Sequence, residues 1–153
     1  MTTYSFDTIE DFIGKEIGVS DWVEITQERV NQFADCTEDH QWIHIDEEKA
    51  KKYSPFGTTI AHGYLTLSLL PKFGSEIGFI PKGVLQVFNY GADRLRFLAP
   101  VKVGARIRNR VTLLSAQEKR PGQILIKTQN TVEIEGEDKP AMSADTLSLA
   151  ILA

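Results

Sequence analysis

The chain has 153 residues, 42% of them hydrophobic and 25% charged, which fits one folded domain over residues 1–153 and excludes a disordered chain. With 17 Lys and Arg against 21 Asp and Glu, the net charge is −4, so the chain lacks the positive charge that nucleic-acid binding needs. The single cysteine, Cys36, excludes an intrachain disulfide, and the lack of a leader pattern and of an apolar run of about 20 residues predicts a cytoplasmic protein with no membrane partner.

The first half of the chain is predicted to consist of helices and loops. Asp7 begins a capping-box pattern, which predicts a short helix over Thr8–Phe12. Val19–Ile25 is typical of a short strand. Thr26 then suits the N-cap of a helix with an i, i+3, i+4 apolar stripe that ends near Asp35.

The next segment contains the most apolar helix of the chain. Cys36–Ile43 shows no clear period and is predicted to be a loop, after which Asp46 caps a short charged helix over Glu47–Lys52. Ala61–Phe73 carries leucines all around its helical circumference, so we expect it to be buried on most sides. Pro71 is expected to kink this helix or to end its regular part.

Strands dominate from Val84 onward, with alternating polar and apolar residues. Turn residues at 120–122 and 136–140 separate the longest of them. The predicted strands are Leu85–Tyr90, Asp93–Phe97, Arg106–Ala116, Gln123–Glu135 and Ala141–Leu152. Long antiparallel strands and one apolar helix predict an α+β domain in which a sheet curls around that helix.

The three histidines lie between residues 40 and 62, just before the apolar helix. Asp39 and His44 are five residues apart, and a turn between them would aim both at one small volume. Such a pair can bind and polarise a water, because a carboxylate accepts a proton and an imidazole exchanges one near neutral pH. The alternative is structural, with Asp39 capping a turn and His44 as a satisfied core histidine.

A metal site and a thiol nucleophile are two further hypotheses for this segment. His40 and His44 have i, i+4 spacing, and His62 or Asp39 would complete a set of ligands, but only on a helix through 40–44, where a loop is predicted. No metal is therefore expected. Nothing near Cys36 demands a reactive thiolate, so we expect a buried structural thiol.

Gly63 marks the start of the apolar helix. Its amide is an unpaired donor at a positive dipole end, and without a side chain it suits the binding of a substrate oxyanion. Equally, Gly63 fits a position where the helix packs closely. His62 either packs in the first turn or lines the pocket, and packing is favoured.

Four short motifs together resemble the MaoC-like dehydratases, which include the (R)-specific enoyl-CoA hydratases, also called hydratase 2. The resemblance is greatest to the nodulation-protein-N-like branch and covers roughly residues 10–150. The motifs that carry it are Asp39-x-Gln41-Trp42-Ile43-His44, Pro55-Phe56-Gly57-Thr58-Thr59-Ile60-Ala61-His62-Gly63, Asn89-Tyr90-Gly91 and Arg96-Phe97-x-Ala99-Pro100-Val101.

The resemblance implies a single hot dog fold, an antiparallel sheet wrapped around a long central helix, in a homodimer whose sheets join edge to edge. It implies an enzyme, an enoyl-CoA hydratase, that adds water to a trans-2-enoyl-CoA and gives an (R)-3-hydroxyacyl-CoA. The coenzyme A thioester is the substrate, and no metal or redox cofactor is implied. The motif commonly has glycine where this chain has Glu38, which we expect to point to solvent although it adopts a positive φ less cheaply than glycine.

Carried over to this chain, the resemblance implies that Asp39 acts as the base, that His44 helps to supply the proton at C2, and that the Gly63 amide holds the thioester oxygen. The implied substrate-binding residues are Gln41, Trp42, His62, Asn89, Tyr90, Gly91, Arg94 and Arg96. An apolar tunnel beside the helix would hold the acyl chain, with Leu65, Leu69, Phe79, Ile80 and Val84 as candidates.

Two other functions remain open for a chain of this family. One is a non-catalytic acyl-CoA or lipid-binding protein. The other is an acyl-CoA thioesterase, but such enzymes typically place a carboxylate on or near the central helix, and Leu65–Lys72 contains none.

Overall fold

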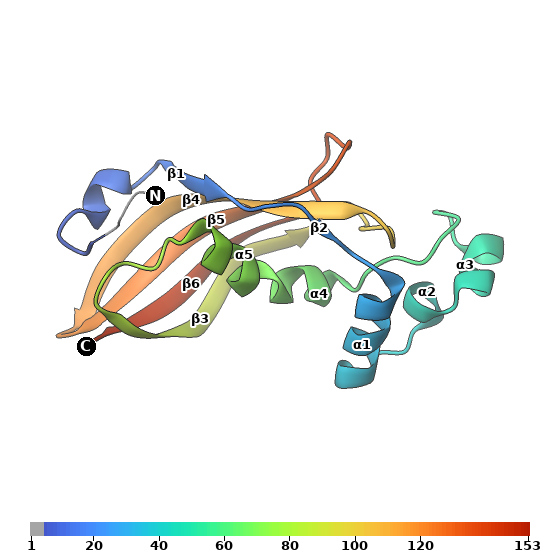
Figure 1. The fold of residues 1–153 in the computed structure, drawn as a ribbon, viewed down its shortest axis with the longest axis horizontal. Coiled ribbons are helices and arrows are strands. Elements are labelled where there is room, and N and C mark those ends of the chain that lie inside the picture. Colours follow the sequence, from blue (N-terminus) through green and yellow to red (C-terminus); the bar gives the residue numbers. More distant parts are fainter. Residues whose placement is uncertain (1–4) are drawn as a thin grey trace.

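The computed structural model describes residues 5–153 as a curved antiparallel sheet with helices along its concave side and beyond one end (Figure 1). The first four residues of the predicted 1–153 domain, on which the prediction about a leader also rests, lie outside the described residues.

The sheet follows the order β1-β4-β5-β6-β3, and β2 also pairs with β4. All of these pairings are antiparallel. The strands are β1 (Glu16–Val19), β2 (Val23–Glu24), β3 (Val84–Phe97), β4 (Arg106–Arg120), β5 (Gln123–Ile134) and β6 (Met142–Leu152). Alternating burial along β4 and β5 gives the sheet one inner and one outer face, as the alternating sequence predicts.

Two strand predictions are wrong in their extent. β3 is one continuous strand where two were predicted, because a shift of register between Asn89 and Gly91 absorbs the irregular residues without ending the pairing. The single strand predicted over Val19–Ile25 is instead split into β1, which begins earlier at Glu16, and the two-residue β2.

The central helix is divided into α4 (Gly63–Ser68) and α5 (Leu70–Ile77), joined at Leu69. Pro71 has no N–H for an intrahelical bond, and its ring would clash with the carbonyl four residues earlier, so it stands in the first turn of a new helix. The predicted kink is thus confirmed, and it lies at Leu69. Phe73 is fully buried, whereas Tyr64 is 66% exposed, so one side of the helix remains uncovered.

Four helical segments lie in the first third of the chain: η1 (Ile9–Phe12), α1 (Gln27–Thr37), α2 (Trp42–Ile45) and α3 (Glu47–Tyr53). Thr26 caps α1 by accepting a hydrogen bond from the Arg29 amide at 3.2 Å, and Asp46 caps α3 through the Lys49 amide at 2.9 Å. Both predicted caps are confirmed.

Other local predictions in this part of the chain are wrong. Thr8 stands at the start of η1 with no side-chain cap, so the capping box predicted from Asp7 does not form. The predicted loop over 36–43 is shorter than expected, because α1 continues to Thr37 and Trp42 begins the single turn of α2. Cys36, in the last turn of α1, is exposed and not the buried thiol that was predicted.

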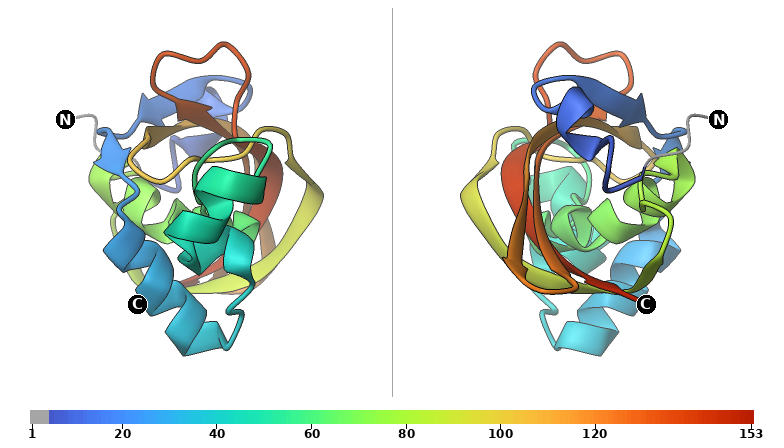
Figure 2. Two further views of the ribbon diagram at one scale, coloured as in Figure 1. Left: turned by 90° about the vertical axis from the view of Figure 1, so that its right-hand side faces the viewer. Right: turned by 90° about the vertical axis from the view of Figure 1, so that its left-hand side faces the viewer.

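The sheet curls around α4 and α5, as the end-on views show (Figure 2). Two apolar clusters fill the space between them. One contains Phe73, Val132 and Met142, and the other contains Leu113 and Ile126. This α+β arrangement is the predicted hot dog fold. No helix among residues 5–153 is long and apolar enough to cross a membrane.

Candidate active site

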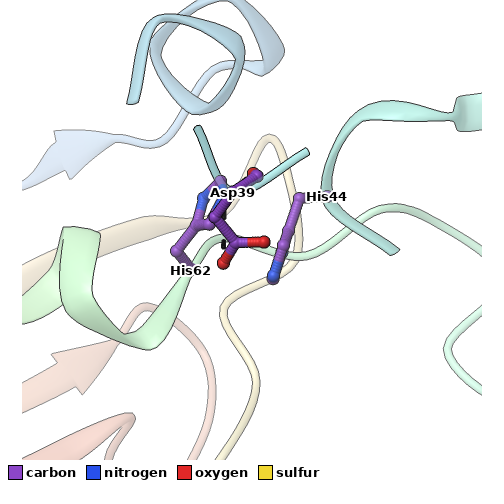
Figure 3. A group of neighbouring side chains, drawn as sticks. All are labelled: Asp39, His44 and His62. Atoms are coloured by element: carbon purple, nitrogen blue, oxygen red, sulfur yellow. Dashed lines mark hydrogen bonds and ion pairs between the residues drawn. The ribbon is translucent and has the colours of Figure 1, made fainter. Parts of the chain in front are cut away.

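Asp39, His44 and His62 come together beyond the N-terminal end of α4 (Figure 3). One side-chain oxygen or ring nitrogen from each residue lies within 4.8 Å of the others. They arrive from the end of α1, from α2 and from the residue before α4, so three separate segments build the site.

Asp39 is aimed by the sharp end of α1. Glu38 stands in the left-handed region with a φ of 63° and turns the chain out of the helix, and its side chain is exposed, as predicted. The Gln41 amide then donates to Asp39 Oδ1 at 3.3 Å. This bond leaves lone pairs on the Asp39 carboxylate free for a ligand.

His44 is held in one tautomer. Its ring is 7% exposed, and Nδ1 donates to the backbone oxygen of Ile60 at 2.7 Å, so Nε2 of the neutral ring is a hydrogen-bond acceptor. Burial lowers the pKa of His44, the Ile60 bond opposes that effect, His62 lowers the pKa further, and the Asp39 charge raises it. The net shift is downward, which favours the neutral ring.

His62 supports both of the other residues. It is 2% exposed, and its ring stacks on that of His44 with 3.8 Å between centroids and 24° between planes. Its Nε2 donates to the backbone oxygen of Asp39 at 3.0 Å. Phe33 packs on His62 at 4.9 Å. These contacts favour the packing interpretation, and His62 lines neither of the cavities described below.

Gln27 is a residue of this site that sequence analysis missed. Its Nε2 donates to the backbone oxygen of His44 at 2.7 Å, and its Oε1 accepts from Thr59 Oγ1 at 2.5 Å. Gln27 thereby ties α2 to α1 and to the segment before α4. No spacing in the sequence marks it, because its partners lie 17 and 32 residues away.

A cavity of 260 Å³ opens beside His44. Gly63 lies at its edge as the first residue of α4, where a backbone N–H has no intrahelical acceptor. A Cβ on Gly63 would approach the Phe97 ring to 3.0 Å, so close packing also accounts for this glycine. The lining residues are His44, Ile60, Ala61, Gly63, Thr66, Phe97, Leu98, Ala99, Pro100, Val101 and Ala141.

A second cavity, of 740 Å³, lies between α5 and the inner face of the sheet. Asn89, Tyr90 and Gly91 line it, as do the tunnel candidates Phe79 and Ile80, whereas the other tunnel candidates Leu65, Leu69 and Val84 do not. The predicted substrate residues therefore fall into separate groups. Gln41 and Trp42 lie in the chain between Asp39 and His44, and Asn89, Tyr90 and Gly91 line this cavity.

Arg94 and Arg96 stand apart from both groups. Arg94 is ion-paired with the buried Asp145, and Arg96 donates to the backbone oxygen of Leu95 at 2.7 Å. Neither lines a cavity. Within one chain the structure does not bring these two arginines to His44.

The geometry of the cluster suits a water better than a metal ion. The rings of His44 and His62 are stacked nearly parallel, so the lone pairs in their planes do not converge on one point. His40, which the metal hypothesis also considered as a ligand, is instead hydrogen-bonded to Asp35 at 2.9 Å. The Asp39 carboxylate lies close to the His44 ring, on which Nε2 is the nitrogen that is not bonded to Ile60, so the two side chains offer two acceptors.

Comparisons with known proteins identify the family of this chain. A sequence model of the MaoC like domain matches residues 8–136. The 3-hydroxyacyl-thioester dehydratase Z of Mycobacterium tuberculosis is 46% identical over 146 residues, covering 94% of this chain and 95% of that protein. Nodulation protein N of Rhizobium leguminosarum bv. viciae is 42% identical over 153 residues, covering 97% and 92%.

Solved structures share the fold. The monoamine oxidase regulatory protein from Archaeoglobus fulgius has a TM-score of 0.80 at 23% identity, over 99% of this chain and 96% of that one. The (R)-hydratase from A. caviae involved in PHA biosynthesis has a TM-score of 0.71 at 23% identity, over 89% and 94%. At these identities the likeness establishes the fold alone.

Proposed function

The chain belongs to the MaoC-like dehydratase family, and from that premise we propose that it is an (R)-specific hydratase of trans-2-enoyl-CoA. The observation that carries the proposal is that the Asp39 carboxylate lies close to His44, whose Nε2 is an acceptor and whose side chain lines a cavity. Membership in the family makes the chain a hydro-lyase of acyl thioesters. The enoyl-CoA substrate and the (R) product are the parts proposed here.

Asp39 and His44 would bind one water as its two hydrogen-bond acceptors. A water that donates both hydrogens to the pair turns an oxygen lone pair toward C3 of the enoyl group. The C3–O bond forms as one proton leaves the water, and the electrons of the double bond move through C2 to the thioester oxygen. A proton then adds to C2, and the double bond becomes a single bond.

The tautomer of His44 limits the order of proton transfers. Because Nδ1 donates to Ile60, Nε2 of the neutral ring carries no hydrogen, so His44 can supply the C2 proton only after it takes one. In this scheme Asp39 acts as the base toward the water, and the proton passes to Nε2 before it reaches C2. Atoms and charges balance, since the water loses one proton and C2 gains one.

The Gly63 amide would stabilise the thioester oxygen. Negative charge develops there as C3 is attacked, and a backbone N–H at the start of a helix stabilises it most in a site that excludes water. His44 and Gly63 line the same cavity, which supports their action on one substrate.

The experiment that tests this function follows the loss of enoyl absorbance with crotonyl-CoA and longer trans-2-enoyl-CoAs. Asp39→Asn and His44→Ala should each lower kcat by about 100- to 10,000-fold, the range for removal of general acid–base groups. Both variants should keep the far-UV circular dichroism of the wild type. Substantial activity in both would contradict the assignment.

The same assay separates the alternative functions. Release of free CoA would indicate a thioesterase. Such an enzyme typically uses a carboxylate on or near the central helix, and Glu76, the carboxylate on that helix, is ion-paired with Lys72. Tight binding of acyl-CoA without turnover at any chain length would indicate a binding protein.

We also propose that the chain forms a homodimer through β3. This strand pairs with β6 along one edge, and within residues 5–153 no strand covers its other edge. Leu85 is 67% exposed and Phe88 53% exposed on it. A long apolar edge strand of this kind is normally covered, and a second copy would cover it by continuing the sheet.

A further inference from the structure

A polar stripe crosses the inner face of the sheet between the two apolar clusters. It consists of Asn109 on β4, Thr128 and Asn130 on β5, and Thr146 on β6. Asn109 is fully buried and Asn130 is 4% exposed. Buried polar side chains cost stability unless they are hydrogen-bonded, so each polar group of the stripe is expected to have a partner.

The stripe satisfies most of its own groups. Asn109 Nδ2 donates to Asn130 Oδ1 at 2.9 Å. Asn130 Nδ2 donates to Thr146 Oγ1 at 2.9 Å and to the Thr128 oxygens Oγ1 and O, each at 3.2 Å. These bonds fix the Asn130 amide as a donor toward both hydroxyl groups.

One hydroxyl hydrogen of the stripe is left over. Thr128 Oγ1 and Thr146 Oγ1 are 3.1 Å apart, and only one of the two hydroxyls can donate across that contact. The other hydroxyl then has its hydrogen without an acceptor among the residues the structure describes. Both threonines line the 740 Å³ cavity, so this donor is available to whatever fills the cavity.

The rest of the cavity is mainly apolar. Leu70, Ile77 and Phe79 from the helix side face Ile126 and Ala150 from the sheet. A plain hydrocarbon chain would match these walls but would bury the free hydroxyl without a partner. A chain with an oxygen atom at the level of Thr128 and Thr146 would match both the walls and the donor.

Successive residues of α4 line the first cavity and the second. Thr66 lines the first, beside His44, and Leu67 and Ser68 line the second. An acyl chain whose thioester is at His44 would therefore have to run past α4 to reach the polar stripe.

We propose that the second cavity binds the distal part of an acyl chain that carries an oxygen substituent, a keto or hydroxyl group, recognised by the Thr128–Thr146 hydroxyl pair. The inference rests on the proposed function, because it takes the acyl thioester as the ligand. It adds the substrate class: oxygenated acyl chains bind better than plain chains of the same length.

Calorimetry on the wild-type protein tests the proposal without needing turnover. The probes are dodecanoyl-CoA and length-matched derivatives with one keto oxygen at successive carbons beyond C4. One narrow range of positions should bind about 3- to 10-fold more tightly than dodecanoyl-CoA, the gain expected from one hydrogen bond. Equal or weaker binding at every position would overturn the proposal.

Valine substitutions identify the donor. In Thr128→Val or Thr146→Val alone, the remaining hydroxyl still has its hydrogen to donate, so a preference for the oxygenated chain should persist. The double variant should lose the preference. Thr131→Val, on the same strand but lining neither cavity, is the matched control and should bind every probe as the wild type does.

The two proposals fail in different ways. Hydration of crotonyl-CoA, whose short acyl chain lacks a distal segment, reports on the proposed function alone. A wild type that hydrates crotonyl-CoA but shows no preference among the long probes would refute the oxygenated chain and leave the hydratase intact. A preference without hydration would refute the hydratase and leave the binding site intact. If a folded double variant still prefers the oxygenated chain, other groups bind the oxygen, and the role of the hydroxyl pair would be overturned.

Discussion

Glu38 turns the chain from α1 into the segment that contains Asp39 and His44, at a φ of 63°. Residues with a Cβ avoid this conformation, which costs them roughly 1–2 kcal/mol, and the related motif commonly has glycine here. The side chain is exposed and lies next to Asp39, so it can affect the site through its backbone or through its charge.

The Glu38→Gly variant should be more stable than the wild type by up to about 1 kcal/mol. Glycine removes the backbone strain, but its greater conformational freedom in the unfolded chain offsets part of the gain in stability. Chemical denaturation measures the change. Glu38→Ala is the matched control, because it removes the charge but keeps the Cβ, and it should show no comparable gain. Equal stabilisation by both would mean that charge, not backbone strain, is the cause.

The pH dependence of hydration should report His44. Its pKa lies below its ordinary value near 6.5, mainly because the ring is buried. Protonation removes the Nε2 lone pair, so kcat/KM should fall as the pH drops, with the midpoint of that fall below 6.5. An NMR titration of His44 supplies the independent value. In Asp39→Asn the His44 pKa should be lower still, since the Asp39 charge raises it. A fall centred above 6.5 would contradict the role of neutral His44.

At the scale of elements, the central helix contains two glycines, Gly63 and Gly74, that differ in how much space surrounds them. A Cβ at Gly63 would meet the Phe97 ring at 3.0 Å, whereas a Cβ at Gly74 would meet nothing within 4 Å. The two positions lie on α4 and α5, on either side of the break at Leu69. A comparison of the two positions therefore separates the effect of close packing at Gly63 from the effect of glycine on helix propensity.

Alanine should have opposite effects at these two glycines. Gly63→Ala should lower stability by about 1 kcal/mol through overpacking, at the low end of the usual range because Phe97 is half-exposed and its ring can move. Gly74→Ala should raise stability by about 0.5–1 kcal/mol, since alanine is the better helix former. Thermal unfolding of both variants is the measurement, and the same sign for both would refute the packing argument.

At the scale of the whole molecule, β3 is the strand through which the dimer is proposed to form. Its inner residues line the second cavity, and its outer edge exposes apolar side chains. A second copy that continued the sheet at this edge would cover the exposed apolar side chains and leave the second cavity to the ligand.

Phe88→Lys should weaken the proposed dimer, because it places a charge where apolar surface would be buried. Sedimentation velocity over a range of concentrations should show a dimer for the wild type and a shift toward monomer for this variant. Tyr53→Lys, on α3 and 61% exposed, is the control and should leave the dimer unchanged. A wild-type monomer at all concentrations would contradict the proposal.

The sequence by itself determined the features that depend on near neighbours. The caps at Thr26 and Asp46, the alternation along β4 and β5, and the helix break near Pro71 follow from local patterns, and the structure confirms them. The motif that contains Asp39 and His44, combined with the motifs at 55–63, 89–91 and 96–101, also predicted the family, because the residues of each motif lie within one short segment.

Only the tertiary structure decided the contacts that join distant segments. The tautomer of His44 depends on a carbonyl 16 residues away, and Gln27 reaches Thr59 across 32 residues. The stacking of His62 on His44 and the polar stripe under the second cavity likewise need several elements to pack before they exist. No local pattern encodes such contacts, because their energy depends on groups that chain folding brings together and that have no fixed spacing in the sequence.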